Sequence, residues 1–181
     1  MVIVAQVVGL CAVILFLLSY QQKKRIHIIL YNTISRFLYI LQYVLLGAYA
    51  GAVLDILGAV SSVAAGRKHT GFIKKHTTAV MLLINACIIT AGVTIAILNN
   101  SWIDLFSLVG VLLHTIAFWI NNERIIRIVS LIGTPFWLVY NFLSRAYGSA
   151  LGDLLTLFSI VIAMIRHRNS ADESQQSPTV E

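Results

Sequence analysis

Two acidic residues, Asp55 and Asp153, lie inside long apolar segments, and each follows an aromatic residue by sixteen positions. The aromatic residues are Tyr39 and Trp137. A carboxylate in a membrane-spanning segment costs at least ~2.5 kcal/mol even on insertion scales, so such an acid normally faces a protein interior or a cavity. If both carboxylates approach one cavity, desolvation and mutual repulsion suit them to proton coupling or to binding a cation or a polyol.

The composition indicates a polytopic membrane protein. Of the 181 residues, 59% are hydrophobic and only 11% are charged, which is too apolar for a soluble domain. A bilayer core of ~30 Å needs roughly 20 apolar residues per helical crossing. The apolar runs are continuous and lack the alternation of barrel strands, so they predict an all-α membrane protein. Seven transmembrane helices are expected, at about 2 to 21, 30 to 48, 50 to 66, 76 to 98, 102 to 120, 126 to 145 and 148 to 166.

The basic residues are distributed unequally between the two sides of the membrane. Twelve of the thirteen Lys and Arg residues fall on one side, and only Arg145 falls on the other. Under the positive-inside rule this pattern predicts an N-terminus outside and a cytoplasmic C-terminus. Arg36 lies past the start of the second helix, and we interpret it as extending its side chain to the cytoplasmic headgroups. The net charge of +6 therefore indicates contact with the lipid bilayer rather than with nucleic acid.

The first and last thirds of the chain resemble each other. Aligned with an offset that falls from 101 to 98 residues, they match at Val8-Gly9 with Val109-Gly110, Gln21 with Asn121, Tyr39 with Trp137, Ala48-Tyr49 with Ala146-Tyr147, and Asp55 with Asp153. A single helix between the copies makes both run the same way through the membrane, which is a parallel 3+1+3 repeat. The predicted organisation is a first three-helix repeat at 1–68, a linker helix with its loops at 69–101, a second repeat at 102–168 and a disordered cytoplasmic tail at 169–181.

Two families share these motifs. With Leu45-Leu-Gly-Ala-Tyr49 and Trp137-Leu-Val-Tyr-Asn-Phe-Leu143, the whole chain resembles the bacterial inner-membrane proteins of the YgjV type. More distantly, the 3+1+3 plan is similar to that of the SWEET and SemiSWEET, or PQ-loop, transporters. The second copy carries their spacing in Gly133, Trp137, Tyr140 and Leu151-Gly-Asp-Leu-Leu-Thr-Leu157.

The second resemblance implies a central pocket in which aromatic and polar side chains bind a sugar. Carried over to this chain, the binding residues are Tyr39, Asp55, Trp137 and Asp153. Acids stand where that family has Asn, so the expected solute is a sugar, a polyol or a cation, moved by alternating access between the repeats. Two other interpretations of the acids remain: contact with outer water or Arg145, and hydrogen bonds between packed helices. The alternative function is a membrane scaffold or assembly partner that does not transport.

Other polar residues in the apolar segments are secondary candidates. Asn141, His114 and Tyr140 are placed near the expected pocket, although lone polar residues in membrane helices more often hydrogen-bond a neighbouring helix. The sequence has no enzyme signature and no Cys/His metal spacing, so neither catalysis nor a cofactor is expected. Because one chain holds both repeats, a monomer is sufficient and an oligomer remains open.

Overall fold

The computed structural model describes residues 2–144 and 146–176, and all regular secondary structure within these ranges is helical. The helices are α1 (Val2–Gln21), α2 (Arg25–Leu46), α3 (Tyr49–Gly66), α4 (Gly71–Lys75), α5 (Thr77–Leu98), α6 (Asp104–Trp119), α7 (Glu123–Leu143) and α8 (Tyr147–Gln176). Six of these are long and apolar enough to cross a membrane. The helix α6, which was expected to cross the membrane over residues 102 to 120, has 16 residues and is shorter than these six helices.

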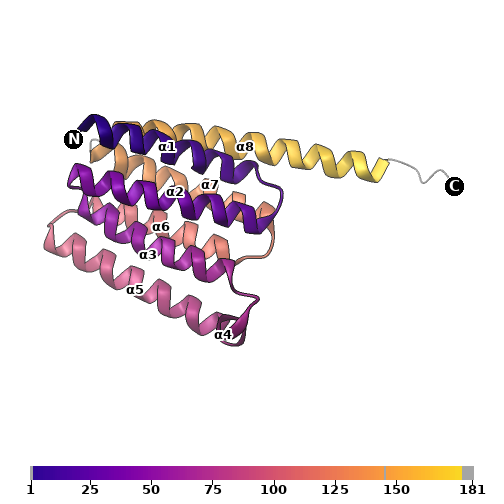
Figure 1. Cartoon of the computed structure of the whole chain (residues 1–181), viewed down its shortest axis with the longest axis horizontal. Helices are drawn as coiled ribbons and strands as arrows, with labels where there is room; N and C mark the ends of the chain where they lie inside the picture. The colour runs from indigo at the N-terminus through magenta and orange to yellow at the C-terminus, as the bar shows by residue number, and fades with distance from the viewer. Residues whose placement is uncertain (1, 145, 177–181) are drawn as a thin grey trace.

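Six helices form a closed ring. Around the ring, α1 packs on α2, α2 on α3, α3 on α6, α6 on α7 and α7 on α8. The helix α8 packs on α1 and closes the ring. Figure 1 shows α1 and α8 side by side along one edge of the bundle and α5 along the opposite edge. The helix α5 lies outside the ring, where it packs on α3 and α6. The interior of the ring is therefore lined by the first three and the last three helices.

Local sequence signals explain several helix boundaries. Gly47 ends α2 with a left-handed φ of 74° and donates its N–H to the carbonyls of Tyr43 and Val44, as glycine commonly does after a helix. Asn122 caps the start of α7. Its side chain accepts hydrogen bonds from the N–H groups of Arg124 and Ile125, which have no backbone partner at a helix start.

The helices differ from the predicted organisation in three places. The second helix begins at Arg25 rather than near residue 30, and the short helix α4 lies in a loop for which no helix was expected. The tail predicted to be disordered from 169 continues α8 to Gln176, in a stretch with good helix formers such as Ala, Glu and Gln. Residues 177–181 lie outside the described part of the chain.

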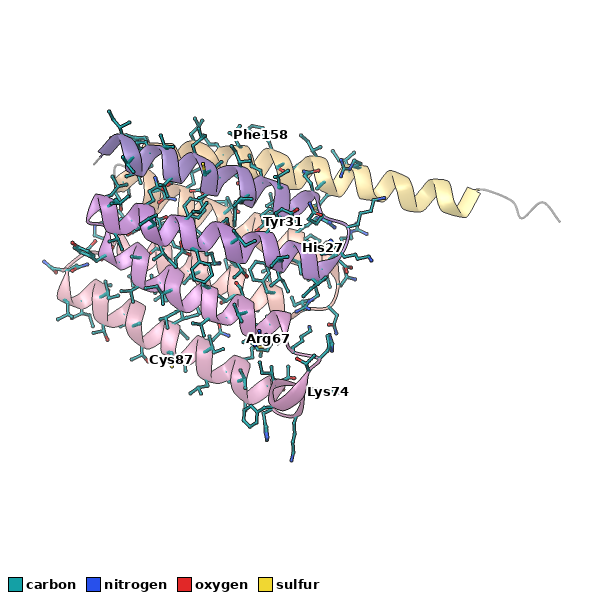
Figure 2. The ribbon with its side chains drawn as sticks, viewed as in Figure 1. His27, Tyr31, Arg67, Lys74, Cys87 and Phe158 are labelled. Atoms are coloured by element: carbon teal, nitrogen blue, oxygen red, sulfur yellow. The ribbon has the colours of Figure 1, made fainter. Side chains whose placement is uncertain are left out.

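The distribution of polar and apolar side chains suits a bilayer. Large apolar residues are exposed on the outer surface, among them Leu83 on α5 and Phe158 on α8. Figure 2 shows Phe158 and Cys87 on the outside of the bundle, and Arg67 and Lys74 at the end where α4 lies. Inside the ring, many polar side chains are buried. An apolar surface around a polar interior is expected when the solvent is lipid.

Candidate functional site

The ring encloses a small cavity to which every one of its helices contributes. Its lining consists of Phe16 on α1, Arg36, Tyr39 and Tyr43 on α2, Asp55 on α3, His114 on α6, Trp137 and Asn141 on α7, and Asp153 on α8. All four residues expected to bind solute lie in this lining, although they come from four different helices. The cavity volume is about 30 Å³. Since one water needs roughly 10–15 Å³, this conformation has room for about two waters.

Asp55 is held by a buried ion pair. Arg36 Nη1 lies 2.5 Å from Asp55 Oδ1, and both side chains are almost completely inaccessible. Arg36 Nε also donates a hydrogen bond of 3.0 Å to Asn32 Oδ1, one turn earlier on α2. The expectation that Arg36 extends to the cytoplasmic headgroups is wrong. Its side chain turns inward because a carboxylate on the neighbouring helix compensates its charge inside the protein, where an unpaired charge is costly.

Asp153 has a neutral partner instead. Its Oδ2 accepts a 2.8 Å hydrogen bond from Asn141 Nδ2, and the Oδ1 of that amide accepts one of 2.9 Å from Tyr43 Oη. Among the described residues, no cationic nitrogen lies within 4 Å of Asp153. Arg145, the alternative partner considered from the sequence, lies outside the described residues. The cavity thus contains two carboxylates and one guanidinium.

Aromatic rings form part of the cavity wall that also contains the two acids. Tyr43 stacks on Tyr39 with ring centroids 6.3 Å apart and on Trp137 at 6.4 Å. Glycine makes room for this wall, since a Cβ added at Gly110 would lie 2.7 Å from Trp137 Cδ1. Such close helix approach at small residues is typical of membrane bundles.

His114 on α6 lines the cavity with its imidazole ring. Its Nδ1 lies 2.9 Å from the carbonyl oxygen of Gly110. A carbonyl only accepts, so Nδ1 carries the hydrogen and the Nε2 of the neutral ring is an acceptor. Nε2 is buried without a hydrogen-bond partner. His114 and Asn141 therefore lie at the cavity, as the secondary candidates were expected to do.

Tyr140 lies between the cavity and a larger pocket. It makes edge-on contacts with Tyr43 and Trp137, but it does not line the central cavity. Instead it lines a pocket of about 450 Å³ at the other end of the bundle from α4. Asn99 and Asp104 also line this pocket and are joined by a 2.9 Å hydrogen bond.

The end of the ring that carries the basic loops is closed by side-chain contacts. Arg25 donates to the carbonyl oxygens of Phe118 and Ile120 at the end of α6. Arg127 donates to those of Tyr20 and Gln22 at the end of α1. Cationic donors at a helix C-terminus satisfy free carbonyls and complement the helix dipole.

Residues 3–171 match the model of a family described as bacterial inner membrane protein, YgjV type. The chain belongs to this family. The match covers nearly all of the six ring helices and both cavity acids. The protein is therefore a polytopic protein of the bacterial inner membrane, a solvent that suits its exposed apolar surface. Neither the curated proteins nor the solved structures contain a match.

Sequence reasoning missed Arg36, Tyr43 and Phe16 as cavity residues. A signal for Arg36 was present, because it is an arginine in an apolar segment followed by an acid in the next such segment. Opposite charges inside adjacent membrane helices are expected to pair. Tyr43 and Phe16 gave no such signal, because aromatic residues are common at lipid-facing and packed positions alike.

Proposed function

We propose that this protein moves a small solute across the inner membrane by alternating access, with Tyr39, Asp55, Trp137 and Asp153 at the solute site. The observation that carries the proposal is the charged cavity between the first and last three helices. Charged residues deep in a membrane bundle are costly and usually mark a solute or ion path. A scaffold needs an outer surface for its partner, but it has no need of two acids in an enclosed interior cavity.

The proposal includes a parallel repeat of α1–α3 in α6–α8, with α5 as the linker. Its support is a set of reciprocal hydrogen bonds between the halves. Ser149 on α8 donates a hydrogen bond to Gln42 on α2. The residue 98 positions after Gln42 is Tyr140 on α7, and the residue 98 positions before Ser149 is Gly51 on α3. These two also form a hydrogen bond, from the Gly51 N–H to the Tyr140 hydroxyl. Such a reciprocal pair is what a parallel repeat about an axis along the membrane normal would produce.

A second pair of bonds follows the same relation. Gln21 near the end of α1 donates to Ser159 on α8, and Trp119 at the end of α6 donates to Ser61 on α3. The two serines are 98 positions apart, as Asp55 and Asp153 are. The Arg25 and Arg127 contacts are reciprocal too, because each joins the start of a middle helix to the end of the other half's first helix.

With α6 as a seventh crossing, both repeats have the same orientation in the membrane. The 16 residues of α6 span about 24 Å, and turn hydrogen bonds at residues 101–106 extend this segment. We assign the end with the basic loops to the cytoplasm, which puts the N-terminus outside and the C-terminus inside. The 450 Å³ pocket then opens outward, and the arginine contacts close the inner end.

The described conformation is an occluded one in this scheme. A cavity with room for about two waters cannot hold a sugar or a polyol, because ligand pockets for such molecules are roughly ten times larger. Separation of Tyr140 from Gly51 opens the cavity outward. Loss of the Arg25 and Arg127 contacts opens it to the cytoplasm.

The test is uptake by the purified full-length protein in liposomes, with sugars, polyols and monovalent cations, each with and without a pH gradient. The Asp55→Asn/Asp153→Asn variant should lose at least tenfold in rate. Asp172→Asn, near the C-terminal end of α8, should keep the wild-type rate. Figure 1 shows that this end of α8 extends beyond the other helices. Uptake that survives the double change would refute the assigned site, and no uptake of any solute would favour the scaffold.

A further inference from the structure

We infer that Asp153 binds and releases a single proton, with the lone pair of His114 Nε2 as the neighbouring acceptor in the cavity. The inference names the ion that accompanies the solute, so it rests on the proposed transport function. The protonation itself is a property of the resting protein and can be measured without a solute.

The charges that line the cavity do not balance. Arg36 contributes one positive charge and is engaged by Asp55 and Asn32. The carboxylate of Asp153 is then left without a compensating charge among the described residues. An enclosed site inside a membrane does not tolerate that excess charge, so a cation from outside the chain must balance it.

The two halves differ at the position of the guanidinium. The residue 98 positions after Arg36 is Thr134, which is buried and donates its hydroxyl to the carbonyl of Ser130 within α7. The first half therefore carries its own cation beside its acid, and the second half does not. Asp153 is the place where a mobile positive charge takes the role that Arg36 has at Asp55.

The size and the ligands of the cavity suit a proton better than a metal cation. The cavity has room for about two waters, and the described residues contain no group of three His, Cys, Asp or Glu side chains that could hold a metal ion. Metal ions in proteins generally need a larger set of ligands than this site offers. A proton needs only one oxygen, and a water in the cavity can deliver it.

His114 lines the same cavity. Its buried Nε2 has no hydrogen-bond partner among the described residues. A buried acceptor without a donor is unfavourable. When hydronium transfers its proton to an Asp153 oxygen, an O–H bond forms there and water remains. The new carboxylic O–H, or that water, can then donate to Nε2, and release of the proton to water reverses the step.

The other charged and titratable groups around Asp153 do not change the assignment of the proton to its carboxylate. They are Tyr20 on α1, Arg36, Tyr39 and Tyr43 on α2, Asp55 on α3 and His114 on α6. The helix α7 faces the carboxylate with the neutral Asn141. The charges of Arg36 and Asp55 cancel, and the tyrosines and the histidine are neutral, so Asp153 is the group at which a net proton is gained.

The experiment is infrared difference spectroscopy of the full-length protein in liposomes between high and low pH. Acidification should produce the C=O band of a protonated carboxyl group in a low-polarity site. Asp153→Asn should abolish that band, Asp153→Glu should retain it at a shifted frequency, and Asp104→Asn should leave it unchanged. A band that persists in Asp153→Asn would overturn the inference.

A second variant keeps the test valid if Asp153→Asn does not fold. Asn141→Leu removes the amide bonded to Asp153, so the same band must shift in frequency, and an unshifted band would count against the assignment. Loss of the band at constant low pH on adding sodium chloride, but not choline chloride, would assign the site to a metal cation and overturn the proton. A band without any solute uptake would refute only the transport function, whereas uptake without the band would refute only the proton.

Discussion

The ion pair between Arg36 and Asp55 depends on the absence of a side chain at Gly58. A Cβ built on Gly58 would lie 2.3 Å from Arg36 Nη1 and 3.1 Å from Val111 Cγ2. Comfortable contacts are about 3.5 Å, so in a Gly58→Ala variant the guanidinium must retreat by about 1 Å. The 2.5 Å contact with Asp55 then lengthens to a distance at which hydrogen bonding is largely lost.

The expected loss of stability follows from three terms. Overpacking a filled site costs about 1–3 kcal/mol, and replacing a helical glycine by alanine returns about 0.5–1 kcal/mol. The lengthened contact adds a part of the about 3–5 kcal/mol that complete separation of the buried pair would cost, and this part offsets the gain from alanine. We therefore expect the free energy of unfolding to fall by about 1–3 kcal/mol, and the midpoint of thermal unfolding by roughly 2–12 °C for a chain of this size.

The assay is thermal unfolding in detergent, with Gly66→Ala as the matched control. Gly66 is in the same helix, but its added Cβ would meet only Ile29 at 3.7 Å and Ile26 at 3.8 Å, which are ordinary van der Waals contacts, so this variant should be as stable as the wild type or slightly more stable. In a background of Arg36→Ala with Asp55→Asn, the cost of Gly58→Ala should shrink by more than about 1 kcal/mol, because the pair is gone. Equal midpoints for Gly58→Ala and Gly66→Ala would refute the reasoning.

Three further predictions concern the two ends of the ring. Arg127→Met removes two charged hydrogen bonds to the end of α1, so the free energy of unfolding should fall by about 1.5–3 kcal/mol in denaturant titrations. Burial, reinforced by the charge of Arg25, lowers the pKa of Lys68 from 10.5 to about 8. Between pH 8 and 10 the unfolded chain therefore binds more protons at Lys68 than the folded chain, and the wild type should gain stability relative to Lys68→Met as pH rises. Tyr140→Ala should open the outer pocket toward the cavity and increase quenching of Trp137 fluorescence by acrylamide.

Each of these has a control and a contrary outcome. Arg124→Met alters an exposed arginine beside the same helix start, and a loss of stability as large as that of Arg127→Met would argue against the helix-end contacts. A stability difference for Lys68→Met that is constant across the pH range would contradict the lowered pKa. The quenching experiment uses a background of Trp102→Phe with Trp119→Phe, so that Trp137 is the remaining tryptophan of the three in the sequence. In that background Tyr147→Ala should leave quenching unchanged.

Sequence reasoning located the helices and the acids for simple physical reasons. An apolar run of about 20 residues can satisfy its backbone in lipid only as a helix, so the crossings followed from composition. Asp55 and Asp153 stood out because a carboxylate in such a run is costly. The boundary at Asn122 was less predictable, since an Asn in a loop becomes a helix cap only when the next residues begin the helix.

The neighbours of the acids were harder to predict. The sequence placed Arg36 near a helix end, but it did not show whether the side chain points to the membrane or to the protein interior. Arg36 was therefore interpreted as a surface residue. Asn141 and Tyr43 lie 98 residues apart in sequence and form one hydrogen bond. No local pattern encodes that contact, because it depends on how two helices with no extensive direct packing face each other across the ring.

The sequence by itself determined that this protein crosses the membrane in helices, that its basic loops share one side and that two acids lie at depths lipid would not tolerate. These features depend on hydropathy and position along a helix, which are local. The tertiary structure decided that Asp55 receives the guanidinium and Asp153 an amide, and that the space between them is only large enough for about two waters. Those outcomes depend on the rotation and packing of the six ring helices, so the chemical difference between the two acids exists only in the folded ring.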